Sequence, residues 1–549
     1  MNVLRYAILI AVLSLAIQTT LGETYHISPN GNDLNSGSFT NPWKSLNSIN
    51  RLKPGDVVVL HGKFNGFVEV NISGLKGKPI KIVGDNATID GSGVLRDGVV
   101  LKPNVSYIEI ENLHITNFSN HWGLALYGSN RNVSINNVEI DRCEVGIHLT
   151  VGDSGKKPWY GDVRNIKISN VYVHNNSIAG LDCTPGPCYN LSIVDSSFTY
   201  NGKDGFGADG IAIESGNRIL IKNVTSSFNA GDGIDLLSRN PLLVNESVEV
   251  VVRESIISNN GLQGLKLWKG GKVVNCLIHS NGLEGLVVVY NGDYIIQNCD
   301  IVRNALLGGY AFTSGYPEVD ALDSQNKINL TIQNTIFAFN GKNPTGLWVS
   351  DNFTSQNCVY YDRDFEEVYI NKTAHSVTRD EINSGYLGLN YGVDPKFVSL
   401  TDFHLTIESP CVDSGIPTTN VDLEYNSRPW GEGYDIGCYE LIYQIIKNIT
   451  PSQAYQLIKT KNVTILDVRT PREFYSGHLP NAINIDFYSP TFKYKLSKLD
   501  KNKAYLIYCR TGHRSGIALK TMKELGFMEV YNMLGGITRW KYEGYPVVR

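Results

Sequence analysis

A short stretch near the C-terminus combines a nucleophile with groups that stabilise its ionised form. Cys509-Arg510-Thr511-Gly512-His513-Arg514-Ser515 follows an apolar run, Leu506 to Tyr508, and leads into a helical pattern from Ser515 to Leu525. A strand that delivers a cysteine into a tight loop at a helix N-terminus favours the thiolate, because loop N–H groups, the helix dipole and nearby arginines stabilise negative charge. The sequence therefore predicts a nucleophilic Cys509 in a loop that binds an oxyanion.

Matching motifs lie on both sides of this loop. They are Asp467-Val468-Arg469, Glu473-Phe474, Gly477-His478-Leu479-Pro480-Asn481-Ala482, Gly535-Gly536 and Trp540. Together with the loop they resemble the rhodanese family of sulfurtransferases over about 100 residues. Four residues separate Cys509 from Arg514, which is similar to the sulfur-transferring members; the related dual-specificity phosphatases carry one more.

This resemblance implies a role for each residue of the loop. Cys509 is expected to accept sulfane sulfur, Arg514 and the loop amides to stabilise it, and Arg510 to bind the anionic donor. Thr511, Gly512, His513 and Ser515 are expected to line the substrate site. The donor would be thiosulfate or a persulfide and the acceptor a thiol or cyanide, with no cofactor required. The alternative is a rhodanese-like module that only binds.

The middle of the chain repeats one pattern. In Arg218 to Leu237, a β-branched run is followed by Asn223, then by Asn229 and Gly233, and similar copies start every 21 to 36 residues. Such a period, with short strands and turns rich in Asn and Gly, is typical of a solenoid. Asn at a fixed position of each coil can hydrogen-bond along the stack, where strands lie about 4.8 Å apart. Residues 105–390 are therefore predicted to form a right-handed parallel β-helix of about ten coils; a leucine-rich repeat fits less well, because its Leu spacing and helical half are missing.

The segments on either side of the repeats complete the predicted domain organisation. Residues 23–104, with Pro54-Gly55-Asp56 before a strand, resemble the N-terminal cap of secreted β-helix proteins of the pectate-lyase-like superfamily. Asp394-Pro395, Ser409-Pro410 and Asp435-Ile436-Gly437 resemble the closing segment of that superfamily. We predict a mainly β protein: a cap at 23–104, the β-helix with its closing segment at 105–440, a linker at 441–447 and a small α/β domain at 448–549. The α/β domain is expected because helix and strand patterns alternate there, with a helix at Pro451 to Lys459 and a strand at Val463 to Val468.

A second candidate site is expected on the β-helix. Alignment of the coils on a turn glycine brings Asp232, Asp235, Lys266 and either Asp204 or Asp209 onto one face of three consecutive coils. Clustered carboxylates can hold Ca²⁺, and a lysine can abstract the proton α to a uronate carboxyl group.

This layout resembles the ninth family of polysaccharide lyases. The matching stretches are Asp204-Gly205-Phe206, Gly231-Asp232-Gly233-Ile234-Asp235 and Leu265-Lys266-Leu267, where Gly231 replaces one acidic residue of the family motif. The resemblance implies calcium ligands and a lysine base. The alternatives are polysaccharide binding without cleavage and ordinary Asp-Gly turns. Several aromatic side chains are candidates to stack on sugar rings, namely Trp159, Tyr160, Trp268 and Tyr290.

The N-terminus and the overall composition predict export. Residues 1–22 have the features of a cleaved signal peptide, with Arg5 before an apolar run from Ala7 to Ile17; an uncleaved anchor is the alternative. The chain holds fourteen Asn-X-Ser/Thr sequons, which are candidate glycosylation sites, and nine cysteines. The net charge of −4 gives no reason to expect nucleic acid as a partner. A secreted or cell-surface protein is predicted, and a binding or adhesion protein without turnover is a further alternative.

The spacing of the cysteines suggests which of them pair. Cys183 and Cys188 flank a short turn, Cys276 and Cys299 occupy equivalent positions in neighbouring coils, and Cys411 and Cys438 lie at the end of the β-helix. Eight cysteines are candidates for pairing, which leaves Cys509 free. The alternative is that several are small buried apolar residues.

Overall fold

The fold is described from a computed structural model of the full chain. The structure describes residues 22–150, 161–184, 186–203, 207–236, 248–289, 292–306, 312–314, 328–340, 347–349, 352–362, 367–371, 376–385 and 388–549. All but the last residue of the predicted signal peptide lie outside these ranges. Within them, none of the helices has the length and apolar character needed to cross a membrane. The chain divides into two compact units, residues 1–441 and 442–549.

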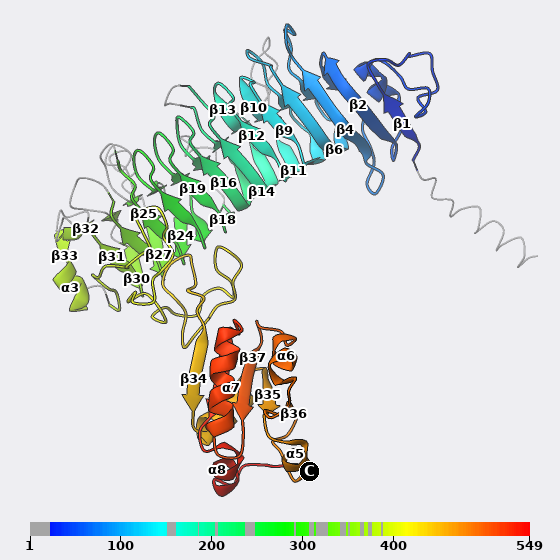
Figure 1. The fold of residues 1–549 in the computed structure, drawn as a ribbon. Helices are drawn as coiled ribbons and strands as arrows, with labels where there is room; N and C mark the ends of the chain where they lie inside the picture. The colour runs from blue at the N-terminus through cyan, green and yellow to red at the C-terminus, as the bar shows by residue number, and fades with distance from the viewer. Residues whose placement is uncertain are drawn as a thin grey trace, which may run out of the picture. The chain divides into compact units, whose positions relative to one another are not determined.

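The first unit is a parallel β-helix (Figure 1). Each coil contributes one short strand to one sheet and one long or broken strand to a second sheet that bends around the corner of the coil. Strands pair in parallel from coil to coil, as in the register of Ile211 with Ile234 and of Ile234 with Leu265. The predicted solenoid class is therefore confirmed.

The strands of the two sheets are short except where one strand turns a corner. The larger sheet contains β1 (Thr24–Ile27), β2 (Val57–Asn65), β4 (Ile80–Asp90), β6 (Ser106–Thr116), β8 (Arg131–Asn136), β9 (Glu139–Asp141), β11 (Val163–Ser169), β12 (Tyr172–His174), β14 (Cys188–Thr199), β16 (Gly216–Ser227), β18 (Val250–Arg253), β19 (Ile256–Ser258), β21 (Gly271–Val274), β22 (Leu277–His279), β24 (Gly292–Gln297), β25 (Asp300–Val302), β27 (Ile328–Gln333), β28 (Ile336–Ala338), β30 (Asn352–Gln356) and β31 (Val359–Tyr361). The smaller sheet contains β3 (Val68–Val70), β5 (Val99–Leu101), β7 (Leu124–Leu126), β10 (Val145–Leu149), β13 (Ala179–Cys183), β15 (Ile211–Ile213), β17 (Ile234–Leu236), β20 (Leu265–Leu267), β23 (Leu286–Val288), β26 (Phe312–Ser314), β29 (Leu347–Val349), β32 (Glu367–Asn371) and β33 (Ser376–Thr378), the last of which pairs antiparallel with β32.

The coils begin earlier in the chain than the sequence predicts. Strands β2 and β4 lie within the segment assigned to a cap, yet β2 pairs in parallel with β4, and β4 pairs in parallel with β6. These first coils lack the Asn and Gly spacing of the later copies, so the repeat pattern does not identify them. A 3-10 helix, η1 (Leu46–Arg51), lies among them with Leu46 and Ile49 buried.

The interior of the β-helix is filled by alternate side chains of each strand. In β16, Ile219 and Ile221 are buried in the core while Leu220 between them is partly exposed, which is the period-two pattern of a strand with one buried face. A ladder of buried asparagine amides follows one corner of the coils, with Asn201 Nδ2 donating to Asn229 Oδ1 at 3.0 Å and Asn229 Nδ2 donating to Asn260 Oδ1 at 3.0 Å. The predicted stacking of asparagines is therefore confirmed.

Residues 388–441 fold back along the larger sheet as a closing segment, after the short helix α3 (Arg379–Asn383). Side chains such as Phe403 and Ile436 pack on Val302 and Ile336, which face outward from the late coils. The outward positions are apolar here because the closing segment covers them.

One predicted disulfide is present, and the other proposed pairs are not. Cys183 and Cys188 are bonded. Every other cysteine is a free, buried thiol. Cys438 shows why pairing is unnecessary, since its thiol donates to Asp300 Oδ2 at 3.2 Å inside the packed closing segment. Seven cysteines are therefore free thiols, which fits the alternative that several of them are small buried apolar residues.

The second unit is a five-stranded parallel sheet with helices on both faces. Its strands, in spatial order, are β34 (Ile445–Ile449), β38 (Glu529–Met533), β37 (Ala504–Tyr508), β35 (Val463–Asp467) and β36 (Ile483–Asn484). Its helices are α4 (Pro451–Thr460), α5 (Pro471–Tyr475), α6 (Phe492–Ser497), α7 (His513–Glu524) and α8 (Gly536–Tyr542). Helices α6 and α7 contribute to the core on one face, and α4 and α8 to the core on the other. The predicted linker at 441–447 is too long by three residues, because β34 already begins at Ile445 and pairs with β38.

Candidate functional site

The predicted loop forms a compact cradle around the sulfur of Cys509. Strand β37 is buried along its whole length and ends at Tyr508, and α7 begins at His513, so Cys509 lies directly between them. Gly512 adopts a left-handed φ of 98°, which lets the loop turn its N–H groups inward. The backbone N–H of Gly512 donates to Cys509 Sγ at 3.1 Å, and Ser515 Oγ donates to the same sulfur at 3.5 Å.

These hydrogen bonds set the ionisation of the thiol. Cys509 is 1% exposed, and burial alone raises the pKa of a thiol. The hydrogen bonds from Ser515 and from the backbone N–H groups of Thr511 and Gly512 outweigh that effect, so the pKa of Cys509 lies below the ordinary value of 9.0. The arrangement stabilises a thiolate that is shielded from bulk water.

Backbone N–H groups at the start of α8 donate hydrogen bonds that fix the path of the Cys509 loop. The N–H of Ile537 donates to the carbonyl of Cys509 at 2.9 Å, and the N–H of Thr538 donates to that of Arg510 at 3.1 Å. A Cβ at Gly536 would lie 2.3 Å from the carbonyl oxygen of Cys509, which explains why glycine stands there. The sequence motif identified this residue, but only the structure reveals its contact with the loop.

Arg514 interacts with Cys509 through its charge, and its hydrogen bonds go to Glu473. Its Nη1 and Nη2 atoms donate to Oε2 and Oε1 of Glu473, both at 2.8 Å. Glu473 also closes the capping box of α5 with Thr470, and the Arg514 guanidinium lowers the pKa of Glu473 to about 2. Arg514 therefore positions the start of α7 against α5. Arg510 and two neighbours, Thr511 and His513, are exposed at the loop.

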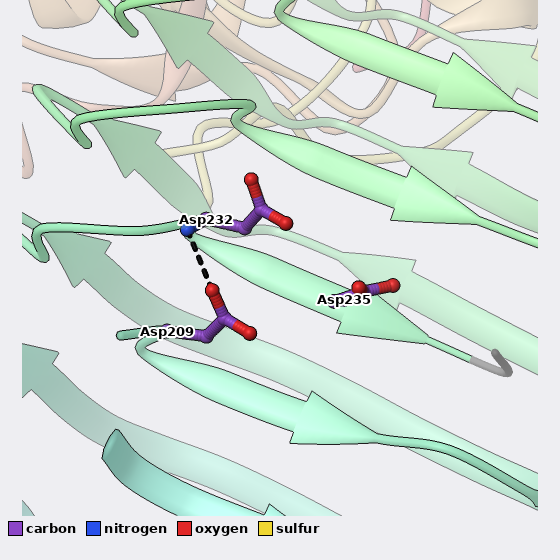
Figure 2. Close-up of side chains that lie close together, drawn as sticks. All are labelled: Asp209, Asp232 and Asp235. Atoms are coloured by element: carbon purple, nitrogen blue, oxygen red, sulfur yellow. Dashed lines mark hydrogen bonds between the residues drawn. The ribbon is translucent and has the colours of Figure 1, made fainter. Parts of the chain in front are cut away.

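The β-helix brings together the second set of predicted residues. Asp209 and Asp232 precede β15 and β17 in consecutive coils, and Asp235 lies within β17 (Figure 2). One carboxylate oxygen from each lies within 4.8 Å of those of the other two. The neighbouring strand β20 adds Lys266, whose Nζ lies 2.5 Å from Asp232 Oδ2 and 3.9 Å from Asp235 Oδ2.

The choice between Asp204 and Asp209 depends on the register of one coil. Alignment of the sequence used Gly205 as the turn glycine, but the strand that pairs with β17 starts directly after Gly210. Gly210 is therefore the equivalent of Gly233, and Ala212 lies beside Asp235. Asp209 is the carboxylate that joins the cluster, and Asp204 lies outside the described residues.

The carboxylates are tied to the scaffold as well as to Lys266. The N–H of Asp232 donates to Asp209 Oδ1 at 2.7 Å, and the N–H of Gln263 donates to Asp232 Oδ1 at 2.9 Å. Burial and the neighbouring Asp232 raise the pKa of Asp209. The Trp268 indole donates to Asp235, so this ring is buried beside the cluster rather than open to a sugar. The other proposed aromatic contacts, Trp159, Tyr160 and Tyr290, lie outside the described residues.

The donor set fits a hard divalent cation in its chemistry. Carboxylate oxygens are the ligands that Ca²⁺ prefers, and Asp209, Asp232 and Asp235 supply them from two coils. Gly231, where the family motif has an acidic residue, adds no side-chain ligand. The ammonium of Lys266 neutralises Asp232, so a bound cation and this ion pair would compete for the same oxygen.

Comparisons with known proteins agree with both halves of this architecture. Residues 450–543 match the family described as "Rhodanese-like domain", residues 25–274 match "Pel9A-like, right handed beta helix region", and residues 187–364 match "Right handed beta helix region". A sulfurtransferase of Allochromatium vinosum is 33% identical over 97 residues, which cover 18% of this chain and 89% of the relative. The thiosulfate sulfurtransferase GlpE of Coxiella burnetii is 34% identical over 95 residues, covering 17% of this chain and 87% of the relative.

Solved structures give similar matches. A rhodanese-related protein of Thermoplasma volcanium is 38% identical, covers 19% of this chain and 97% of its own, and has a TM-score of 0.17. The pectate lyase Pel9A is 14% identical, covers 77% of this chain and 97% of its own, and has a TM-score of 0.39.

Fold and site thus define a parallel β-helix joined to an α/β domain with a cysteine-centred loop. The chain belongs to the rhodanese family through residues 450–543, and its residues 25–364 form a right-handed β-helix region, in part of the Pel9A-like type.

Proposed function

We propose that the protein transfers sulfane sulfur through a persulfide on Cys509. The observation that supports this most directly is the pair of hydrogen bonds from Gly512 N–H and Ser515 Oγ to Cys509 Sγ. A loop whose N–H groups stabilise a thiolate can also stabilise a persulfide anion, because its single negative charge lies one sulfur atom beyond Sγ.

The transfer takes place in two balanced steps. The Cys509 thiolate attacks the outer sulfur of thiosulfate; a new S–S bond forms, the old one breaks, and sulfite leaves with the electron pair. Cyanide or a thiolate then attacks the terminal sulfur, which leaves as thiocyanate or a new persulfide and restores the Cys509 thiolate. This is nucleophilic catalysis through a covalent intermediate.

The loop residues divide these tasks. Arg510, an exposed cation, binds the anionic donor, and Thr511 and His513 line the approach to the sulfur. Gly512 and Ser515 stabilise the sulfur anion, while Arg514 positions α7 through Glu473.

Thiocyanate formation from thiosulfate and cyanide tests this proposal. The purified full chain is expected to turn over, and Cys509→Ser to lose the activity. Lys520→Ala, which removes an exposed cation from α7 away from the loop, is the control for Arg510→Ala. Arg510→Ala should raise the KM for thiosulfate while Lys520→Ala leaves it unchanged. Equal turnover in Cys509→Ser and the parent chain would exclude Cys509 as the nucleophile.

A second candidate function is calcium-dependent lysis of a polyuronate on the β-helix. It is supported by the approach of Lys266 to Asp232 and Asp235 beside a third carboxylate, Asp209. Bound Ca²⁺ would neutralise a uronate carboxylate and acidify its α proton. Displacement of Lys266 from Asp232 by the cation would free its ammonium, and the neutral amine formed after deprotonation would accept that proton.

Release of unsaturated uronates from polygalacturonate in the presence of Ca²⁺ tests the second candidate. Lys266→Ala should abolish it, whereas Cys509→Ser should leave it intact. Retained polygalacturonate binding without release would assign the β-helix to binding alone.

In either case we propose that the protein is exported, in keeping with its N-terminal sequence and its Cys183–Cys188 disulfide.

A further inference from the structure

One row of residues runs along an outer corner of the β-helix, where the larger sheet bends. Each member has a left-handed φ between 48° and 59°, and nine of the eleven are asparagines, the residue type that tolerates this conformation best after glycine. We call this row the asparagine track. Its members are Asn86, Asn112, Asn137, Asn170, Asp195, Asn223, Glu254, Asn275, Asn298, Asn334 and Asn357.

The late half of the track is occupied by the chain itself. Residues 414–421 of the closing segment, drawn in yellow in Figure 1, lie along it. Asn357 Nδ2 donates to the carbonyl of Ser414 at 2.7 Å, and Asn334 Nδ2 donates to that of Ile416 at 2.7 Å. At the far end, Asn275 Nδ2 donates to the carbonyl of Val421 at 2.8 Å.

Between these two ends of the contact, at Asn298, threonine hydroxyls form the hydrogen bonds. Thr418 Oγ1 donates to Asn298 Oδ1 at 2.7 Å, and Asn298 Nδ2 donates to Thr419 Oγ1 at 2.8 Å. The segment thus advances about two residues for each coil, and each coil offers it one amide. The track contacts an extended chain through backbone carbonyls, through the N–H of Ile416, which donates to Asn334 Oδ1 at 2.9 Å, and through threonine hydroxyls.

The early half of the track has the same left-handed backbone, and among the described residues no segment of the chain lies along it as residues 414–421 lie along the late half. Asn112, Asn137 and Asn170 are exposed, whereas Asn298 and Asn334 at equivalent positions are fully buried. Amides still pair along the row, with Asn137 Nδ2 donating to Asn112 Oδ1 at 2.7 Å. The Asn170 amide donates beside the row, to Asn136 Oδ1 at 2.9 Å. A primary amide has two N–H groups, so each of these pairings uses one of them and leaves the other available to a ligand.

A groove lies at the early end of the track. It has a volume of about 700 Å³, and its lining includes Asn86, Asn112 and Asn137 together with Asp85 and Glu139. The outward positions beside it are polar, with Thr88, His114 and Glu139 in register where the late coils have Ile336 and Val359. This half is therefore a polar surface in its own right and not an uncovered part of the core.

The negative charge at the groove indicates which kind of ligand can bind there. Asp85 and Glu139 place carboxylates at its rim. Of the 53 acidic and 49 basic residues of the chain, residues 442–549 hold only seven and 17, which leaves residues 1–441 strongly acidic. At this groove, a neutral or basic ligand is therefore favoured over an acidic one.

We propose that the early half of the asparagine track binds an extended, neutral or basic polypeptide segment of a partner protein. The partner's backbone carbonyls take the place that those of Ser414, Ile416 and Val421 have in the late half. The amide spacing of one per coil selects an extended main chain, and the acidic rim selects against negative charge.

A synthetic peptide tests this directly. The probe is the neutral sequence of residues 414–421, SGIPTTNV, with both ends blocked, titrated onto the full chain. In the test variant, Asn112→Gly, Asn137→Gly and Asn170→Gly are combined; glycine keeps the left-handed backbone and removes the amides. In the control, the same change is made in a second exposed ladder with the same φ, namely Asn132→Gly, Asn165→Gly and Asn190→Gly.

The two variants separate the outcomes. The probe should bind the parent chain and the control variant with equal affinity. It should bind the test variant at least about tenfold more weakly, because several hydrogen bonds are lost there. Absence of binding to the parent chain would overturn the proposal, and so would equal binding to both variants, which would place the probe elsewhere, including in the late half. If polygalacturonate, and not the peptide, loses binding in the test variant, the track is a glycan site and the polypeptide proposal is wrong.

Discussion

The Cys509 loop and the Asp232 cluster stabilise charge by opposite means. At Cys509 the negative sulfur is held by neutral donors, the Gly512 N–H and the Ser515 hydroxyl, within seven residues of sequence. At Asp232 a full positive charge on Lys266 lies against carboxylates supplied by neighbouring coils. The first site depends on the path of the backbone, and the second depends on the balance of side-chain charges.

This difference determines what each site tolerates. Backbone donors cannot be removed by changing a side chain, but they are displaced when another atom crowds the loop. An ion pair survives small backbone shifts, but the loss of one partner leaves a buried charge uncompensated. The following predictions use this contrast, in order of expected effect.

Crowding behind the Cys509 loop should have the largest effect. Gly536→Ala adds a Cβ 2.3 Å from the carbonyl oxygen of Cys509, at a left-handed φ of 54°. We expect the C-terminal domain to lose about 3 kcal/mol of unfolding free energy and the protein to lose thiocyanate formation. Denaturant unfolding and the activity assay measure the two effects.

Gly544→Ala is the matched control for this change. Gly544 also has a left-handed φ, of 82°, but nothing lies within 4 Å of its added Cβ. It should cost only about 1 to 2 kcal/mol and leave the activity unchanged. Equal losses in the two variants would show that strain at φ, and not contact with the loop, explains Gly536.

Removing charge from the β-helix cluster should have a smaller but clear effect. Asp232→Asn keeps an acceptor for the Gln263 N–H but leaves Lys266 without its closest partner. We expect the β-helix to lose about 2 kcal/mol and any affinity for Ca²⁺ to fall by more than tenfold. Thermal unfolding with and without Ca²⁺ measures both.

Asp195→Asn controls for the change of charge alone. Asp195 is exposed, and its carboxylate accepts only from Asn223 among the hydrogen bonds described for it, so its replacement should alter stability by less than about 0.5 kcal/mol. If both variants unfold alike and bind Ca²⁺ alike, the ion pair with Lys266 does not stabilise the cluster.

A buried carboxylate whose hydrogen bonds come from a thiol and a backbone N–H should instead make the stability depend on pH. Burial raises the pKa of Asp300 from 3.8 to about 7, and this carboxylate accepts from the N–H and the thiol of Cys438. Between pH 4 and 7 the folded state holds a proton that the unfolded state has released. Stability is therefore greatest at the acid end of this window and falls as the pH rises to 7, by about 1.4 kcal/mol for each unit of the pKa difference.

Asp300→Asn should flatten this slope. Asp435 and Glu440 also have raised pKa values, of about 6 and about 7, through burial, so part of the slope should remain. The measurement is the midpoint of thermal unfolding of the β-helix between pH 4 and 8. An unchanged slope in Asp300→Asn would contradict the assignment.

Removing one donor from the Cys509 sulfur should have the smallest effect. Ser515→Ala removes one of several hydrogen bonds that lower the pKa of Cys509, so the pKa should rise and alkylation by iodoacetamide at pH 7 should slow by about two- to tenfold. Thr521→Ala, which loses a hydroxyl donating to the Ile517 carbonyl on the same helix, should leave the rate unchanged. A rate unaffected in Ser515→Ala would mean that the backbone donors suffice alone.

The contrast between the sites also explains what could be predicted from the sequence. The Cys509 loop is contiguous, so its strand, turn and helix were all predictable from local patterns. The stacking of Asn201 on Asn229 was predictable because the repeat fixes which residues lie one coil apart. The role of Arg514 was not, because its partner Glu473 lies 41 residues away and the motif does not state which atoms meet.

The register of one coil and contacts between segments far apart in the sequence explain where the structure differs from the predictions. The coil with Asp209 contains five more residues before its strand than the alignment allowed, and Gly205 and Gly210 are equally good turn residues. The closing segment places Val421 on Asn275, 146 residues earlier in the chain, and no local pattern specifies such a contact. All seven free thiols are buried, and the spacing of cysteines along the sequence does not show how their side chains pack.

Intact-mass analysis after incubation with thiosulfate tests the central claim most directly. The reduced full chain should gain one sulfur, about 32 Da, on Cys509, and Cys509→Ser should gain none. Addition of cyanide should remove the extra mass and release thiocyanate. A folded, reduced protein that gains no mass, or that gains it equally in Cys509→Ser, would contradict sulfur transfer through Cys509.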